Sequence, residues 1–287
     1  MHAVSGSVSR CSGFVLGLFL VAFGCGGDRD APPGPPLVIA TIAPLATFVE
    51  RLAGDRVAVE TLLPPGANPH TYEPTMTQML LAGRARLLVE VGHPALPFER
   101  VWRERLTRGR SDLAVVNASR DLVVDGEEGH VWLSPADAPA MAATLALALE
   151  AELPGATPAI EANLAAFLRE TEALDAELHT LLDPYRGRAF LVYHPAWGAL
   201  AREFGLEQVA IERHGKPPSP DDLVRLIARG RREGIRTVFV QPQAPRRGAQ
   251  AVAAELGATL VVLDPLAPDW AENLRRTARL LAEGFSP

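Results

Sequence analysis

The chain has 287 residues, of which 48% are hydrophobic and 22% are charged, and its formal net charge is −6. This is the composition of a globular protein, long enough for one large domain or for two lobes that each bury a core. The negative charge, and a sequence without any basic stripe interleaved with aromatic residues, argue against a nucleic-acid partner.

The first 25 residues are predicted to be a targeting segment. Gly13 to Phe23 is an apolar run that is short for a bilayer span and typical of a signal-peptide core. It leads into Cys25, and a small residue before a cysteine resembles a bacterial lipobox, in which the cysteine becomes the acylated N-terminus. Ala22 and Phe23 depart from the usual lipobox residues. We therefore expect acylation of Cys25, with ordinary secretion as the alternative.

Residues 26 to 36 are predicted to be a tether. The stretch is rich in proline and glycine and has no apolar residues to bury, so it is typical of a spacer between an anchor and a domain. The second cysteine, Cys11, lies inside the targeting segment. No cysteine pair would remain in the mature chain, so packing alone would have to hold the fold together.

From Leu37 onward, short apolar runs alternate with helical stretches. Four runs rich in Val, Leu and Ile are expected to be strands: Leu37–Ile42, Val57–Leu63, Ala85–Val91 and Leu113–Asn117. Between them, stretches such as Pro44–Leu52 and Thr75–Ala82 have helical spacing. Near-continuous apolar strands that alternate with helices predict a parallel sheet covered on both faces.

Two helical segments follow this first series. Pro135–Glu152 is rich in Ala and Leu, with Ser134 as its expected N-cap. After a Pro-Gly break, Thr157–Leu182 keeps apolar residues at helical spacing over about seven turns. Its interspersed Glu and Arg predict a half-exposed helix that joins two lobes.

A second series of strands and helices completes the chain. Its expected strands are Ala189–Tyr193, Gln208–Glu212, Thr237–Gln241 and Thr259–Leu263, and its expected helices are Asp221–Gly230 and Arg246–Leu256. The sequence therefore predicts an α/β fold with two lobes, each a mostly parallel sheet flanked by helices, joined by one long rigid helix. The expected boundaries are 37–156 for the N-terminal lobe (N-lobe), 157–184 for the connecting helix and 185–287 for the C-terminal lobe (C-lobe).

Four polar residues end a strand or precede a helix, most of them with a proline nearby: His70, His130, His194 and Asp264. The carboxyl ends of parallel strands share one edge of a sheet, so two residues from each lobe could meet across a cleft. Three imidazoles and one carboxylate form a four-coordinate set that suits Zn²⁺, with ligand distances of about 2.0–2.2 Å. Any one of the four alone is weakly specific, because a single loop histidine or strand-end aspartate is more often solvated or a cap.

Five segments carry a specific family resemblance: PPGANPHTYEPT (64–75), GHVWLSP (129–135), YHPAWG (193–198), GKPPSP (215–220) and VVLDPLAPDWAENLR (261–275). From about Leu37 to the C-terminus, the chain resembles the metal-binding solute-binding proteins of ABC importers, the zinc and manganese group. The resemblance implies two α/β lobes joined by one long rigid helix. It also implies a receptor rather than an enzyme, which captures a metal ion and delivers it to a membrane permease with a cytoplasmic ATPase.

The same resemblance assigns the metal ligands by motif position. His70 and His130 would be the N-lobe ligands, and His194 and Asp264 the C-lobe ligands. The manganese branch commonly has a carboxylate at the position of His194, so this nitrogen-rich set favours Zn²⁺ over Mn²⁺, which prefers oxygen. Many zinc-branch relatives carry a His- and Asp-rich loop before the second motif. Here Val124–Gly129 has no histidine, so the metal capture by that loop is expected to be missing.

The implied protein is a monomer in the periplasm or on the outer face of the cytoplasmic membrane, held there by a lipid on Cys25. One alternative is a receptor of the same family for Mn²⁺ or another divalent metal. Another is a zinc-dependent hydrolase, but the sequence has no HExxH motif, and four protein ligands leave no open position for an activated water. A third is an adhesive lipoprotein, but the sequence offers no repeat or adhesive module that supports it. The roles of His93 and His214 stay open.

Overall fold

The computed structural model describes residues 1–2, 34–69, 71–122, 129–212 and 216–286. The chain divides into Met1–Gly34 and a compact unit, Pro35–Pro287, and the description below concerns that unit. Cys25, His70 and His214 lie outside the described residues, as does nearly all of the 124–129 loop. No helix within the described ranges combines the length and the apolar character needed to cross a bilayer.

Two four-stranded parallel sheets form the compact unit. The first has the strand order β2-β1-β3-β4 and the second the order β6-β5-β7-β8. The strands are β1 Leu37–Ala40, β2 Ala58–Thr61, β3 Leu87–Glu90, β4 Ala114–Asn117, β5 Ala189–Val192, β6 Glu207–Ala210, β7 Thr237–Val240 and β8 Thr259–Val262. Because β1, β3, β5 and β7 are central, they are the strands with the most buried side chains, as expected for strands covered on both faces.

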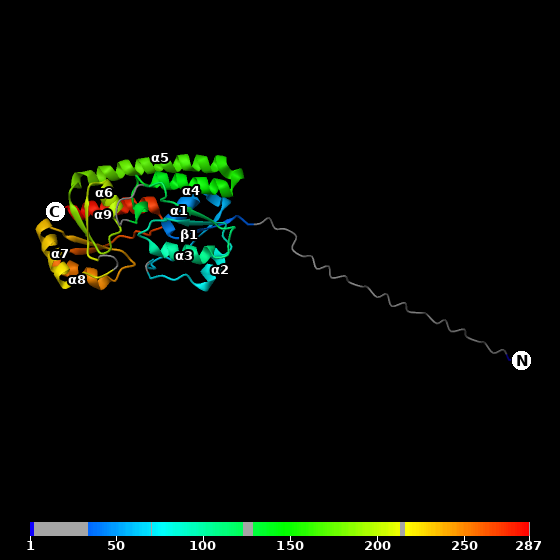
Figure 1. Ribbon diagram of the computed structural model, residues 1–287, viewed down its shortest axis with the longest axis horizontal. Coiled ribbons are helices and arrows are strands. Elements are labelled where there is room, and N and C mark those ends of the chain that lie inside the picture. The colour runs from blue at the N-terminus through cyan, green and yellow to red at the C-terminus, as the bar shows by residue number, and fades with distance from the viewer. Residues whose placement is uncertain (3–33, 70, 123–128, 213–215, 287) are drawn as a thin grey trace. The chain divides into compact units, whose positions relative to one another are not determined.

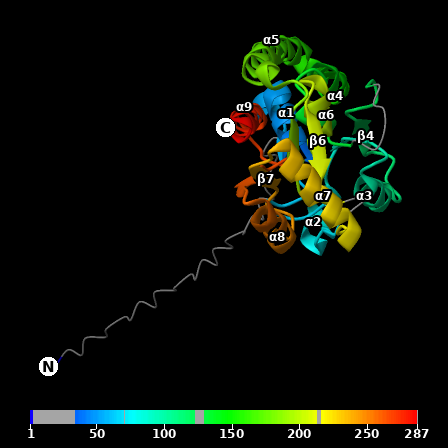
Figure 2. The ribbon, with the colours of Figure 1, turned by 90° about the vertical axis from the view of Figure 1, so that its left-hand side faces the viewer.

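Helices cover both faces of each sheet (Figures 1 and 2). In the N-lobe, α1 and α4 lie on one side and α2 and α3 on the other, and in the C-lobe α6 and α9 lie opposite α7 and α8. Their bounds are α1 Ala43–Ala53, α2 Met76–Ala82, α3 Pro97–Thr107, α4 Ala138–Glu152, α5 Thr157–Leu182, α6 Gly198–Glu203, α7 Pro220–Glu233, α8 Arg246–Leu256 and α9 Trp270–Phe285. The predicted fold class is confirmed by this architecture.

The connecting helix α5 has the bounds expected from the sequence and runs along the side of both lobes (Figure 1). It packs on α1 and α4 of the N-lobe and on α9 of the C-lobe. Three aromatic rings join these helices: Phe48 of α1 lies 4.9 Å from Phe167 of α5 and 5.1 Å from Trp270 of α9, measured between centroids. All three side chains belong to one hydrophobic core. The lobes thus share packed surface, although the exact boundaries of the lobes stay a prediction.

The start of α4 differs from the sequence-based expectation. The helix begins at Ala138, with Asp137 at the N-cap position and no side-chain cap, rather than at Pro135 with Ser134 as the cap. The Ser134 hydroxyl accepts a hydrogen bond from the Asp137 amide at 3.2 Å and donates one to Glu203 of α6. Ser134 therefore caps the turn 135–137 that precedes α4, and its hydroxyl also makes a contact with the other lobe.

Candidate metal centre

A small cavity lies between the two lobes, lined from the N-lobe by side chains that include His130 and Trp132 and from the C-lobe by His194, Glu212 and Gln243. Its volume is about 50 Å³. That is room for an ion or for one or two waters, and much less than the roughly 300 Å³ or more of a pocket for a drug-sized ligand.

Two predicted ligands meet in this cavity. His130 precedes the short 3₁₀ helix Val131–Leu133, and His194 follows β5 by two residues. Their Nε2 atoms lie 3.4 Å apart, and their ring centroids lie 5.2 Å apart at an interplanar angle of 74°. The structure therefore brings together one imidazole from each lobe, with the same ring nitrogen of each directed at the other.

Glu212 orients the C-lobe histidine. Its Oε1 lies 2.5 Å from Nδ1 of His194, and both side chains are only 13% exposed. The pairing follows from the sheet, because the Glu212 amide donates to the Tyr193 carbonyl at 2.9 Å and so places Glu212 beside His194. A carboxylate accepts only, so Nδ1 must carry the proton in this bond. In the neutral ring, the lone pair is then on Nε2, the atom that faces His130.

Asp264 is held at the edge of the cavity. It follows β8 by two residues, and its Oδ1 accepts hydrogen bonds from Gln243 Nε2 and from the Leu266 amide, each at 3.0 Å. Gln243, Pro265 and Leu266 line the cavity, whereas Asp264 is not among the described residues that do so. Within the described ranges, no three His, Cys, Asp or Glu side chains converge as a metal-holding group.

The remaining histidine motifs are only partly described. His70 lies outside the described residues, but Asn68 and Pro69, which come directly before it, line the cavity. His214 is likewise not described. His93 accepts a hydrogen bond on Nδ1 from the Ala95 amide at 3.1 Å, so one function of its ring is to shape the turn that follows β3.

Two tryptophans tie the ligand segments together. Trp132, which is 1% exposed, donates from Nε1 to the Pro265 carbonyl at 2.8 Å, and Trp270 donates from Nε1 to the Trp132 carbonyl. The Trp132 ring also lies 5.1 Å from the His130 ring. These contacts connect the His130 segment of the N-lobe to the Asp264 segment of the C-lobe, so Trp132 acts through packing and main-chain bonds.

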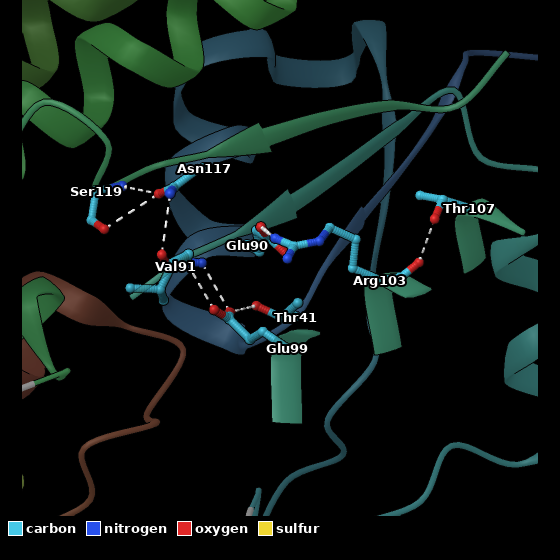
Figure 3. A network of polar contacts seen from close by, with 9 residues as sticks. Thr41, Glu90, Val91, Glu99, Arg103, Thr107, Asn117 and Ser119 are labelled. Atoms are coloured by element: carbon cyan, nitrogen blue, oxygen red, sulfur yellow. Dashed lines mark hydrogen bonds and ion pairs between the residues drawn. The ribbon is translucent and has the colours of Figure 1, made fainter. Parts of the chain in front are cut away.

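A buried carboxylate fixes the N-lobe edge of the cavity (Figure 3). Glu99 at the start of α3 accepts from the Thr41 hydroxyl at 2.5 Å, from the Val91 amide at 2.9 Å and from the Gly92 amide at 2.8 Å. Burial raises the pKa of Glu99 to about 7, against the lowering effect of these hydrogen bonds. Its neighbours Leu96 and Phe98 line the cavity, so the network holds this wall in place.

Gly92 allows the close approach that this network needs. Its φ is +77°, and a Cβ atom built on it would lie 2.0 Å from Cγ of Asn117. Asn117 donates to the Gly92 carbonyl at 3.1 Å. Only glycine combines this backbone conformation with that contact.

Two site residues were not predicted from the sequence. Glu212 lies at the end of an expected strand, as His194 and Asp264 do. The expectation that polar residues at strand ends meet at one sheet edge could therefore have included it. A glutamate on a half-exposed strand rarely means a metal site. Gln243 comes three residues after β7 in a loop. Nothing in its local sequence marks it, and only the fold brings it to Asp264.

Comparison with known proteins agrees with this geometry. The family model for zinc-uptake complex component A, a periplasmic protein, matches residues 38–284. The zinc-binding lipoprotein AdcA of Streptococcus pneumoniae is 28% identical over 272 residues, which cover 87% of this chain and 53% of AdcA. The chain thus spans about half the length of the first curated relatives that it matches.

Two further similarities extend over the whole fold. The high-affinity zinc uptake system protein ZnuA of Bacillus subtilis is 25% identical over 280 residues, covering 88% of this chain and 86% of that protein. A crystal structure of ZnuA superposes with a TM-score of 0.84 at 35% identity, covering 88% of this chain and 100% of that one. The sequence match, the two-lobed fold and the pair of facing histidines lead to one conclusion: the chain belongs to the family of zinc-uptake complex component A periplasmic proteins.

Proposed function

We propose that this chain captures Zn²⁺ outside the cytoplasm and delivers it to the membrane permease of an ABC importer. The observation that carries the proposal is the 3.4 Å separation of the two Nε2 atoms of His130 and His194. Two nitrogens bound at about 2.0–2.1 Å to one tetrahedral Zn²⁺ stand about 3.3–3.4 Å apart. The pair therefore has the spacing that a shared zinc ion requires.

The proposed ligand set is His70 and His130 from the N-lobe with His194 and Asp264 from the C-lobe. The position of Asn68 and Pro69 in the cavity wall supports His70 as a member. The hydrogen bond from Gln243, which lines the cavity, supports the nearness of Asp264. Three nitrogens and one oxygen suit Zn²⁺ better than the harder Mn²⁺.

Capture and release would use the two lobes. Each lobe supplies part of the ligand set, so the site is complete only when the lobes are close, and a permease that separates them would release the ion. Because α5 packs on helices of both lobes, we propose a small rocking motion rather than a wide hinge. The protein would act as a monomer, with the permease subunits and their cytoplasmic ATPase as its partners.

The proposed location is the periplasm or the outer face of the cytoplasmic membrane, with a lipid on Cys25. The name of the relative AdcA, a zinc-binding lipoprotein, supports such an anchor. Labelled palmitate should enter the wild-type protein in its host and should not enter a Cys25→Ser variant. An unlabelled, freely secreted wild type would leave ordinary secretion as the explanation.

Native mass spectrometry of the full chain, purified without chelator, tests the metal function. We expect one Zn²⁺ per chain. Bound zinc should also raise the melting temperature, because a ligand that binds only the native state stabilises it by mass action. A protein that takes up no zinc when titrated with the ion would contradict the proposal.

A further inference from the structure

The hydrogen bonds of Asp264 are distributed unevenly between its two carboxylate oxygens. Oδ1 accepts from Gln243 Nε2 and from the Leu266 amide, both at 3.0 Å. A carboxylate oxygen has two lone-pair positions, so both positions of Oδ1 are occupied. Oδ2 accepts no hydrogen bond from any residue that the structure describes. Asp264 therefore presents a single oxygen to a ligand.

Gln243 is oriented by this contact. Since a carboxylate cannot donate, the atom that faces Asp264 must be the amide nitrogen of Gln243. The other end of the amide, Oε1, is buried and has no hydrogen-bond partner within the described part of the chain. A buried acceptor without a partner costs free energy, so the bond to Asp264 is the one contact among the described residues that accounts for a polar side chain at this position.

The main chain around Asp264 resists a reorientation that would expose both oxygens. Asn273 of α9 donates to the Asp264 carbonyl at 2.8 Å, and Trp132 of the N-lobe donates to the Pro265 carbonyl at 2.8 Å. With the backbone fixed on both sides of the side chain, only the loss of a donor to Oδ1 would free that oxygen.

We propose that Gln243 determines the metal specificity of the site by restricting Asp264 to one ligand oxygen. This inference rests on the proposed zinc function and on Asp264 as a ligand. Three imidazole nitrogens and one oxygen give four ligands, which is the tetrahedral set of Zn²⁺. Mn²⁺ favours oxygen ligands and octahedral coordination, so a second carboxylate oxygen would help Mn²⁺ more than Zn²⁺. Gln243 withholds that oxygen.

The test is Gln243→Leu in the full chain, which removes the donor and keeps most of the side-chain volume. Competition titrations of Zn²⁺ and Mn²⁺ should show the zinc preference narrowed by about tenfold relative to wild type, or about 1.4 kcal/mol. The control is Gln250→Leu, which removes an exposed amide on α8 that is not among the described residues lining the cavity. It should leave the ratio unchanged. Gln243→Met repeats the test with a flexible side chain in case the leucine variant does not fold.

Cobalt reports the coordination number directly. Four-coordinate Co²⁺ absorbs visible light much more strongly than five- or six-coordinate Co²⁺. We expect strong absorption for the wild type and for Gln250→Leu, and weaker absorption for Gln243→Leu. A folded Gln243 variant that has the wild-type metal ratio and the wild-type cobalt spectrum would overturn the role of Gln243 and leave zinc binding intact. A wild type that binds no zinc would overturn the proposed function itself.

Discussion

The two lobes share one strand order but use the carboxylates near the cavity differently. In the N-lobe, Glu99 accepts hydrogen bonds from Thr41, Val91 and Gly92, none of which is a proposed ligand. In the C-lobe, Glu212 accepts from Nδ1 of His194, whose other nitrogen faces the cavity. The same kind of residue therefore stabilises backbone in one lobe and orients a metal-binding ring in the other.

The described chain has two hydrophobic cores of unequal size. The N-lobe sheet belongs to a large core that continues through α4, α5 and α9 into one face of the C-lobe sheet, where it includes Phe190 and Phe239. The side of the C-lobe sheet that faces α7 and α8 has a separate, smaller cluster, which includes Leu191, Val238 and Val252. The lobes therefore share the large core, and they differ at the site in their carboxylates: Glu99 holds the cavity wall, and Glu212 orients a proposed ligand. Substitutions in the two lobes should separate these effects.

The largest expected effect is on zinc affinity, from His130→Ala and from His194→Ala. Each removes one of two facing nitrogens, so we expect affinity to fall by about a thousandfold, or about 4 kcal/mol. The unfolding free energy of the metal-free protein should change little. Isothermal titration with Zn²⁺ and a competing chelator measures the first quantity, and urea denaturation with chelator measures the second. His93→Ala is the control, and a ligand variant that keeps wild-type affinity would lose its place in the site.

Glu99→Ala should lower the stability of the fold and leave the zinc affinity nearly unchanged. It leaves the Thr41 hydroxyl and the Val91 and Gly92 amides without their acceptor in a buried position. We expect the unfolding free energy to fall by about 3 kcal/mol, since each buried donor left unpaired costs about 1–3 kcal/mol. Zinc affinity of the folded fraction should stay close to wild type. If Glu99→Ala instead weakens zinc binding as strongly as a ligand variant, the division of roles between the lobes is wrong.

Glu212→Ala should weaken zinc binding by about tenfold to a hundredfold, the usual range for the loss of a partner that orients a metal-binding histidine. The His194 ring would lose the acceptor that fixes its Nδ1 proton and its orientation. Glu212→Gln keeps a carbonyl oxygen at the same place and should restore most of the affinity. Equal losses in both variants would mean that the negative charge of Glu212, rather than its hydrogen bond, matters to the ion.

The fold was predictable because its signals are local and repeated. Runs such as Leu87–Glu90 and Thr237–Val240 are typical of strands buried on both faces. The sequence of α5 has apolar residues at helical spacing along its whole length. The positions of His130 and His194 at segment ends also followed from the sequence, since strand ends meet at one edge of a parallel sheet. Their separation did not, because it depends on how the two lobes pack.

What could not be predicted depends on contacts between distant segments. Ser134 accepts a hydrogen bond from the Asp137 amide, as a capping serine does, and its hydroxyl also donates to Glu203, 69 positions along the chain. Gln243 meets Asp264 across 21 positions, from a loop with no motif. In each case the contact is tertiary, and no pattern of spacing within one segment predicts it.

The contact between Ser134 and Glu203 gives a test of how the lobes are joined. Glu203 of α6 also accepts from the Ala136 amide at 3.1 Å. Burial, together with the nearby carboxyl of Asp175 on α5, raises the pKa of Glu203 from its ordinary value of 4.5 to about 7, against the lowering effect of the hydrogen bond from Ser134. Other charged or titratable groups lie around this contact. Arg202 pairs with Asp137, and His179 lies beside Asp175.

The raised pKa fixes the sign of the pH dependence. The folded protein holds a proton on Glu203 that the unfolded chain releases at lower pH. The stability that the protonated Glu203 contributes to the folded protein is therefore fully present below pH 4.5 and is lost as the pH rises through about 7.

Glu203→Gln keeps an acceptor for Ser134 and Ala136 and removes the ionisation of this side chain. The unfolding free energy, measured with chelator, should therefore fall less steeply between about pH 5 and pH 8 than in wild type. Glu99 contributes a slope of the same sign in both proteins, because its pKa is also raised to about 7, and the variant should flatten the profile without abolishing it. A variant profile as steep as the wild type would mean that Glu203 is ionised in the folded protein at neutral pH, and that the lobes are joined there by a charged contact.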